Sequence, residues 1–287
     1  MQFTKDDFLS CIDIINSKNY DYGNDILYRH CVFDCLPKPG SSQIDTKLSS
    51  IIWLIGKAYS ADPTRSAPAN TFSNKGLGNS FEQIAQKVYG FTDAYSEFYE
   101  SLKKLRANNY SFDSSRDDQE TLLKTVQLVE DLNKMLRAAM TSLARDKKQD
   151  ASESENVMSF CSKFLHFMCP HLFFIYDSFS FSGGSALFGK TKDRVLDPPT
   201  AEVEKRIRID SEAKKFFKAK TIAPLSNDFT EPISSYYKHC LRAYALASFL
   251  KKSEKECAKQ IADSEESRYM PRLVDSILMR ITKETAE

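Results

Sequence analysis

Apolar residues recur every three or four positions along most of the chain, with polar and charged residues between them. This spacing is the period of an α-helix that buries one of its faces. Glycine and proline, which interrupt helices, number only 9 and 10 among the 287 residues. The pattern therefore predicts an all-α fold of roughly ten helices.

The longest periodic stretch, residues 117–147, predicts a long spine helix with one apolar stripe. The stripe consists of Leu122, Val126, Val129, Leu132, Leu136 and Met140. Shorter helices are expected at about 5–17, 45–61, 79–89, 92–107, 154–168, 200–219, 231–250, 252–264 and 271–284. Another helix is expected to start near Ser178, and a loop is expected to contain Gly183 and Gly184.

The polar sequence RDKKQDASESE at the end of the spine helix predicts a linker. It divides the chain into an N-terminal helical lobe, residues 1–150, and a C-terminal helical lobe, residues 151–287. One intertwined domain is the alternative, because a chain of this length accommodates either arrangement.

The composition is that of a globular protein, with 41% hydrophobic and 28% charged residues, and it excludes a chain that is disordered throughout. The 40 Lys and Arg residues nearly balance the 39 Asp and Glu residues, so the formal net charge is +1. Because proteins that bind duplex DNA display a basic surface, any such surface must be local here.

No apolar run approaches the roughly 20 residues that cross a bilayer. The first residues, MQFTKDDF, lack the pattern of a secretion signal. We therefore expect a cytoplasmic protein with no membrane partner. The seven cysteines, an odd number, are expected to be reduced thiols that lie mostly in the core.

The stretch from Asn156 to Gly189 holds only two charged residues, Lys163 and Asp177. Its other residues are apolar, aromatic, small or neutral polar, which predicts an interior segment. Buried charges are costly unless they are paired or used in function. These two residues are therefore the first candidates for chemistry.

Lys163 lies on a polar strip of the helix predicted at 154–168, beside an aromatic wall. The strip comprises Ser159, Ser162, Lys163 and His166, and the wall includes Phe160, Phe164 and Phe167. One interpretation makes Lys163 an amine nucleophile, with its pKa lowered by apolar surroundings, and Asp177 its acid–base partner. The other makes Asp177 or Ser178 a helix N-cap and Lys163 a surface lysine that extends its amine into water.

The residues of this segment form a recognisable pattern, S-F-x-[ST]-K-F-L-x-F followed by [IL]-x-D-[SR]. They are Ser159, Phe160, Ser162, Lys163, Phe164, Leu165 and Phe167, then Ile175, Asp177 and Ser178. The pattern resembles the core of the helix-hairpin-helix DNA glycosylases and is most similar to the divergent 8-oxoguanine glycosylase-like group. The resemblance implies an all-α, two-lobed fold with a helix-hairpin-helix-like segment near 154–190. It also implies a flipped base held between the lobes, attack of Lys163 on the sugar C1′ and assistance by Asp177.

Two features depart from the family pattern. The residues at the position of the hairpin turn, Ser159-Phe160-Cys161-Ser162, include no glycine, whereas the usual turn brings glycine amides to a DNA phosphate. Lys163 and Asp177 are also closer in sequence than in the familiar members, with Pro170 between them. The second helix of the hairpin would therefore be short.

Further residues are candidates for contact with DNA. Those nearest to the catalytic candidates could stack on the flipped base or read its edge: Phe164, His166, Phe167, Tyr176 and Phe179. Those that could contact the DNA backbone or wedge between bases are Lys57, Tyr59, Arg65, Ser159, Ser162, Lys205, Arg206 and Arg208. The alternative is an ordinary capped loop at 57–65 and a solvated helix face at 201–220.

No metal or cofactor is expected. His166, Cys169 and His171 are residue types that bind zinc, but Pro170 interrupts their helix and no fourth ligand suggests itself. The pair Gly183-Gly184 lacks the glycine spacing of nucleotide-binding loops.

The sequence thus favours a monomeric DNA glycosylase that acts on duplex DNA with a modified base and that could also cleave abasic sites. An oxidised purine follows from the resemblance, whereas a hypermodified pyrimidine of phage DNA would fit the unusual hairpin equally well. The first substrate points to DNA repair and the second to antiviral defence. Either Lys163 or an activated water would be the nucleophile. The alternative is a catalytically inert helical protein-interaction module in which Lys163 and Asp177 form a structural ion pair.

Overall fold

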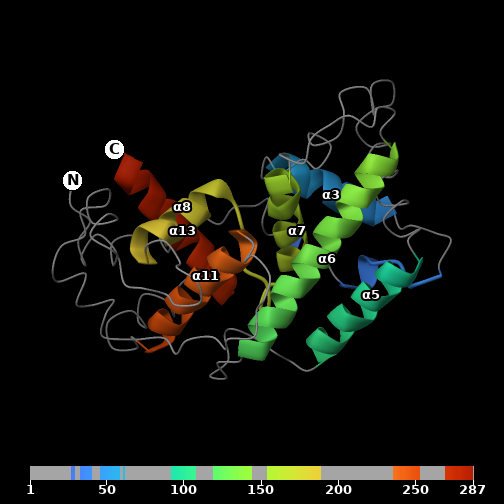
Figure 1. Ribbon diagram of the computed structural model, residues 1–287, viewed down its shortest axis with the longest axis horizontal. Coiled ribbons are helices and arrows are strands. Elements are labelled where there is room, and N and C mark those ends of the chain that lie inside the picture. Colours follow the sequence, from blue (N-terminus) through green and yellow to red (C-terminus); the bar gives the residue numbers. More distant parts are fainter. Residues whose placement is uncertain are drawn as a thin grey trace. The chain divides into compact units, whose positions relative to one another are not determined.

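The computed structural model describes residues 27–29, 33–40, 46–58, 61, 92–107, 119–143, 154–188, 235–252 and 269–286. Within these ranges the named secondary-structure elements are seven α-helices and one short 3-10 helix, and no strand is formed (Figure 1). The all-α class predicted from the apolar periodicity is confirmed for this part of the chain.

The helices begin and end close to the predicted positions. They are η1 (Phe33–Cys35), α3 (Thr46–Ala58), α5 (Thr92–Ala107), α6 (Gln119–Leu143), α7 (Ser154–Met168), α8 (Ser178–Phe188), α11 (Ser235–Lys252) and α13 (Met270–Ala286). The helices predicted at 5–17, 79–89 and 200–219, and the body of the one at 252–264, lie outside the described residues.

Contacts between Cα atoms divide the chain into two compact units, and each is described by itself. The first unit comprises Asp21–Tyr110 and Leu123–Phe173, and it contains α3, α5, α7 and most of α6. The second comprises Met1–Tyr20, Ser111–Leu122 and Phe174–Glu287, and it contains α8, α11 and α13. The linker predicted near residue 150 lies outside the described residues, so a division into lobes at that point stays a prediction.

The first unit is built on helices that bury regular apolar stripes. On α6, the four members of the predicted stripe that belong to this unit and whose side chains are described are all buried: Val126, Val129, Leu132 and Leu136. Leu122, which the division assigns to the second unit, is buried as well. On α5, the hydroxyl of Tyr95 donates to the carbonyl oxygen of Pro37 at 2.6 Å. The ring of Tyr99 lies 5.1 Å from that of Phe33 in η1, so α5 and η1 pack together. Helices α3 and α7 are also in contact.

The second unit is a cluster of three helices, α8, α11 and α13, each of which contacts the other two (Figure 1). Gly183 lies where α8 meets α13: a Cβ atom at this position would be 2.0 Å from the carbonyl oxygen of Leu278. The loop predicted at Gly183 and Gly184 is therefore wrong, since both residues lie inside α8. A glycine is required here because the backbones of the two helices approach too closely for a side chain.

None of the helices in the described ranges is both long enough and apolar enough to span a membrane.

Candidate functional site

Helix α7 is buried on all sides along most of its length. Every residue from Phe160 to Cys169 is buried, including three members of the polar strip that the sequence places beside the aromatic wall. Lys163 is only 2% exposed, and Ser162 and His166 are fully buried. The interpretation of Lys163 as a surface lysine that extends its amine into water is therefore wrong. The sequence could not decide this because a polar strip is usually the solvated face of a helix.

The amine of Lys163 is held on α7 itself. Its Nζ donates to the hydroxyl of Ser159, one helical turn earlier, at 2.7 Å. Ser159 is partly exposed, whereas the residues that follow it are buried. Two aromatic rings of the same helix, Phe160 and Phe164, are stacked with their centroids 5.8 Å apart. The amine thus lies in a helix rich in buried aromatic side chains, with a hydroxyl group as a hydrogen-bond acceptor.

The hairpin turn that the resemblance implies at residues 159–162 is absent, because the chain is helical from Ser154 to Met168. The amides in the middle of an α-helix bind carbonyl oxygens four residues earlier, so they are not available to grip a phosphate. Ser162 donates its hydroxyl to the carbonyl oxygen of Ser159 at 3.0 Å. Contact of the Ser159 and Ser162 side chains with DNA stays a prediction.

His166 links three parts of the first unit. Its Nδ1 is 2.9 Å from the carbonyl oxygen of Phe173, and its Nε2 is 2.7 Å from the hydroxyl of Tyr28. Because a carbonyl oxygen only accepts, Nδ1 carries the proton in this bond, and a neutral ring then accepts the Tyr28 proton at Nε2. The ring of Tyr28 also packs on Phe167 at 4.9 Å. Both ring nitrogens of His166 are thus bound within the protein, which is the arrangement of a structural histidine.

Asp177 caps the N-terminus of α8. Its Oδ1 accepts from the backbone amide of Ser180 at 2.8 Å, and the Ser180 hydroxyl in turn accepts from the amide of Asp177 at 3.2 Å. This reciprocal pair is a capping box, which satisfies two amides at the helix start. The N-cap role considered for Asp177 is confirmed, and its half-buried carboxylate is fixed in orientation.

The residues leading to Asp177 are extended, and α11 supplies partners for their backbone. The carbonyl oxygen of Phe174 accepts from the hydroxyl of Tyr236 at 3.2 Å, and that of Ile175 accepts from Nε2 of His239 at 2.6 Å. A buried carbonyl outside helices and sheets needs such a partner. Sequence reasoning missed both α11 residues, although their spacing of three places them on one helix face.

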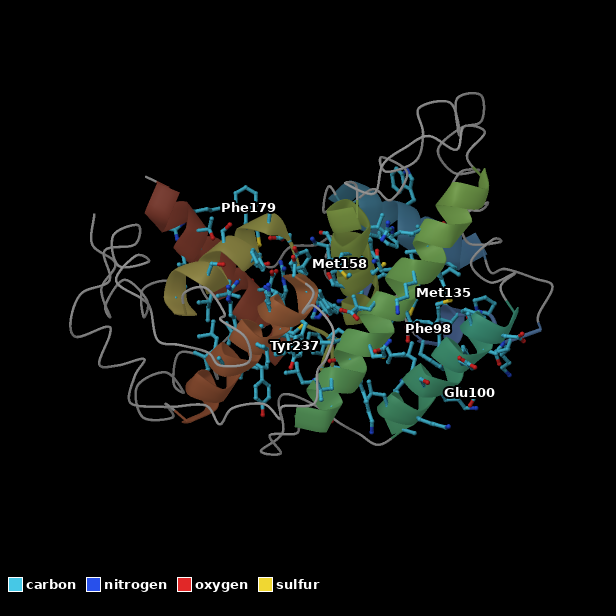
Figure 2. The ribbon with its side chains drawn as sticks, in the orientation of Figure 1. Phe98, Glu100, Met135, Met158, Phe179 and Tyr237 are labelled. Atoms are coloured by element: carbon cyan, nitrogen blue, oxygen red, sulfur yellow. The ribbon has the colours of Figure 1, made fainter. Side chains whose placement is uncertain are left out.

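Of the five candidates for stacking on a base, Phe179 alone is exposed, at 53%. It projects from the first turn of α8, two residues after Asp177 (Figure 2). The other four are buried: Phe164, His166, Phe167 and Tyr176. Tyr176 packs edge-on against Tyr236 and His239 and so belongs to the core of the second unit.

The structure does not describe the side chains of the remaining candidates. Lys57 is in α3, but its side chain is not described, and the others are Tyr59, Arg65, Lys205, Arg206 and Arg208. Because Lys163 belongs to the first unit and Asp177 to the second, each is described in its own unit, and their joint action stays a prediction.

A buried arginine on α11 was not foreseen. The guanidinium of Arg242 lies 4.9 Å from the centre of the Phe181 ring and donates to the hydroxyl of Ser185 at 2.7 Å. Burial lowers the pKa of Arg242 from 12.5 to about 10. Arg242 thus joins α11 to α8 by stacking and a hydrogen bond, which explains how the second unit keeps a charge in its core.

The cysteines with described side chains, Cys35, Cys161, Cys169 and Cys240, are buried free thiols, as predicted for the chain as a whole. Burial raises the pKa of Cys169 from 9.0 to about 12, although Arg106 opposes the shift, and burial also raises the pKa of Cys161 well above its ordinary value. Such thiols stay protonated at neutral pH and are poor nucleophiles. Among the described residues, no group of three or more His, Cys, Asp or Glu side chains could hold a metal ion.

Searches of protein-family profiles, of curated proteins and of solved structures find no match for this chain. The functional proposal therefore rests on the chemistry of α7 and of the start of α8.

Proposed function

We propose that this protein is a DNA glycosylase that flips a modified base out of the duplex and cleaves its glycosidic bond. The observation that carries the proposal is the position of Lys163. This residue is only 2% exposed, it lies in a helix rich in aromatic residues, and its amine is bound to a serine hydroxyl. Only a neutral amine is a nucleophile, and removal from water favours the neutral form.

In the proposed reaction, Nζ of Lys163 forms a bond to C1′ while the bond from C1′ to the base nitrogen breaks. The base leaves with the electron pair and takes up a proton. The nitrogen of the adduct then loses a proton. The bond between C1′ and O4′ breaks, O4′ takes up a proton, and an imine forms between C1′ and Nζ. Hydrolysis of the imine releases the enzyme, whereas elimination of the 3′ phosphate would cleave the strand as an abasic-site lyase does.

Asp177 has the properties of a fixed carboxylate in this proposal. Its bond to the Ser180 amide holds it in one orientation, and the N-terminus of α8 stabilises its negative charge. A carboxylate fixed in this way can stabilise positive charge that develops on the sugar or accept the amine proton. The neighbouring Phe179 is exposed and can stack on a base.

The sequence resemblance supports the same proposal and extends it to the two-lobed fold and helix-hairpin-helix-like segment of the glycosylases. We propose an oxidised purine or a hypermodified pyrimidine as the substrate. Excision of the purine would give the protein a role in DNA repair, and excision of the pyrimidine a role in defence against phage.

The test is trapping of the imine with borohydride on duplexes that carry an abasic site, 8-oxoguanine or modified cytosines. The wild type should form a covalent adduct that Lys163→Met, an unbranched substitute of similar length, does not form. Asp177→Asn keeps an efficient N-cap but removes the charge, so it should slow base release by about 100-fold or more without unfolding the protein. A folded wild type that forms no adduct and releases no base would overturn the proposal.

One observation favours the alternative of an inert interaction module: Asp177 is already engaged as the cap of α8. In that case Asp177→Asn would have no effect beyond stability, and the protein would not be retained on DNA at low salt.

A further inference from the structure

We propose that Ser159 is the residue that positions the Lys163 amine for attack, rather than a residue that contacts DNA phosphate. This inference rests on the proposed function and deepens it. It starts from the 2.7 Å hydrogen bond between Nζ of Lys163 and Oγ of Ser159 on α7.

The helix geometry explains why these two side chains meet. Residues four apart lie on the same face of an α-helix, and long side chains point back toward the N-terminus. The Lys163 side chain therefore runs back along α7 to Ser159. Burial alone does not direct its flexible four-carbon stem, which can adopt many rotamers. A hydrogen bond at the tip selects one position for Nζ.

A hydroxyl suits this task because it can bind the amine in both protonation states. It accepts a hydrogen bond from the ammonium, and after deprotonation it can rotate and donate to the nitrogen lone pair. A carboxylate could only accept, and its charge would favour the ammonium over the neutral nucleophile. Ser159 can thus bind Nζ in either protonation state.

The position of Ser159 also provides a route for the proton. Ser159 is partly exposed and precedes the buried stretch that contains Lys163. Its oxygen can take a proton from the ammonium while its own hydroxyl proton passes to water, which leaves a neutral amine and an unchanged serine. The charge that must leave the buried amine before attack is therefore carried away at the edge of the buried segment.

Ser162 provides a matched comparison within the same helix. It is adjacent to Lys163 and fully buried, but its hydroxyl proton is donated to the carbonyl oxygen of Ser159 at 3.0 Å. This bond of the Ser162 hydroxyl is to the helix backbone, whereas that of Ser159 is to the amine.

The test compares Ser159→Thr with Ser159→Val, two side chains of the same shape that differ in the hydroxyl group. At saturating abasic-site duplex, Ser159→Val should slow imine trapping about tenfold, because a misplaced nucleophile loses effective molarity. Ser159→Thr should stay within about twofold of the wild type. Labelling of Lys163 by formaldehyde and cyanoborohydride, followed by peptide mass spectrometry, measures its reactivity toward a small aldehyde that needs no positioning. This labelling is slow compared with proton exchange, so its rate does not depend on the route by which the proton leaves and should not fall in Ser159→Val.

Each outcome distinguishes the two proposals. If the wild type traps abasic DNA but the Thr and Val variants behave alike, the role of Ser159 is overturned and the glycosylase proposal stands. Equal losses in trapping and in formaldehyde labelling would show a structural role for Ser159 and would also overturn the inference. If the wild type traps no duplex, both proposals fall. Melting curves establish that each variant is folded, and Ser159→Ala replaces Ser159→Val if the branched side chain prevents folding.

Discussion

From Asn156 onward, helix α7 and the N-terminus of α8 each contain one charged residue of the stretch 156–189, and they differ in how that charge is held. Lys163 lies inside α7 and is buried together with Ser162 and His166. The Asp177 carboxylate lies at the N-terminus of α8, half-buried, and accepts a hydrogen bond from a helix amide. The comparison shows that a low density of charge predicts an interior segment, whereas the role of each charge depends on where the helix begins and ends.

The strongest way to test the comparison is to remove the buried amine. Lys163→Met should lower imine formation and base release more than about 1,000-fold, as expected for loss of a nucleophile. It should leave the free energy of unfolding unchanged or raise it by up to about 2 kcal/mol, because an apolar side chain replaces a buried charge. Trapping assays and urea unfolding measure the two effects. Unchanged base release, or a large loss of stability, would indicate that Lys163 is a structural residue.

The second test concerns the close approach of α8 to α13. Gly183→Ala should lower the free energy of unfolding by about 3 kcal/mol, because its Cβ would meet the carbonyl oxygen of Leu278. Gly184→Ala is the matched control, since its Cβ would meet only the flexible side chain of Arg242, at 3.2 Å. Alanine also favours the helix by about 1 kcal/mol at either position. Denaturant unfolding should therefore show a large loss for the first variant and little change for the second, and equal losses would contradict the backbone contact.

The third test uses the thiol that follows α7. The pKa of Cys169 is raised from 9.0 to about 12 in the folded protein, so above pH 9 the unfolded chain loses a proton that the folded chain keeps. The contribution of Cys169 to the free energy of unfolding is therefore fully present below pH 9. Above pH 9 the free energy of unfolding falls as pH rises, with a slope that approaches about 1.4 kcal/mol per pH unit for this group. Unfolding of the wild type and Cys169→Ala between pH 8 and pH 10.5 checks this effect. The variant should show the shallower slope, and parallel curves would show that the thiol is not desolvated.

The smallest expected effect separates the cap of α8 from its charge. Asp177→Ala should lower the free energy of unfolding by about 1 kcal/mol, whereas Asp177→Asn should change it by only a few tenths. Thermal melts measure this difference. In the proposed reaction both variants release the base more slowly, and to a similar extent, because both lack the carboxylate. Base release that is lost in Asp177→Ala but kept in Asp177→Asn would contradict the role of Asp177.

Most helices of the described chain could be predicted from local pattern. The bounds expected for α5 and α7 agree with the structure, because apolar periodicity and N-terminal capping are properties of neighbouring residues. The loop expected at Gly183 was wrong because the close contact of α8 with Leu278 of α13 cannot be read from nearby residues. The turn implied at Ser159 was wrong because the helical pattern of 154–168 continues through it.

The candidate site was predicted in part. The low density of charge drew attention to Lys163, which is buried, and to Asp177, whose N-cap position follows from its place before a helix. Their roles in catalysis stay predictions. Tyr236 and His239 were missed, because they bind carbonyl oxygens more than 60 residues away in sequence. Their contribution exists only once α11 packs against the extended segment before α8.

The sequence by itself determined the helical class, the position of most described helices and the isolation of two charges in an apolar segment. These are consequences of residue order over one or two helical turns. The tertiary structure alone decided that Ser162, Lys163 and His166 of the polar strip are buried, that His166 binds Tyr28 and Phe173, and that a glycine must face α13. Burial and hydrogen-bond partners depend on segments distant in the chain, whose approach is set by packing and not by local pattern.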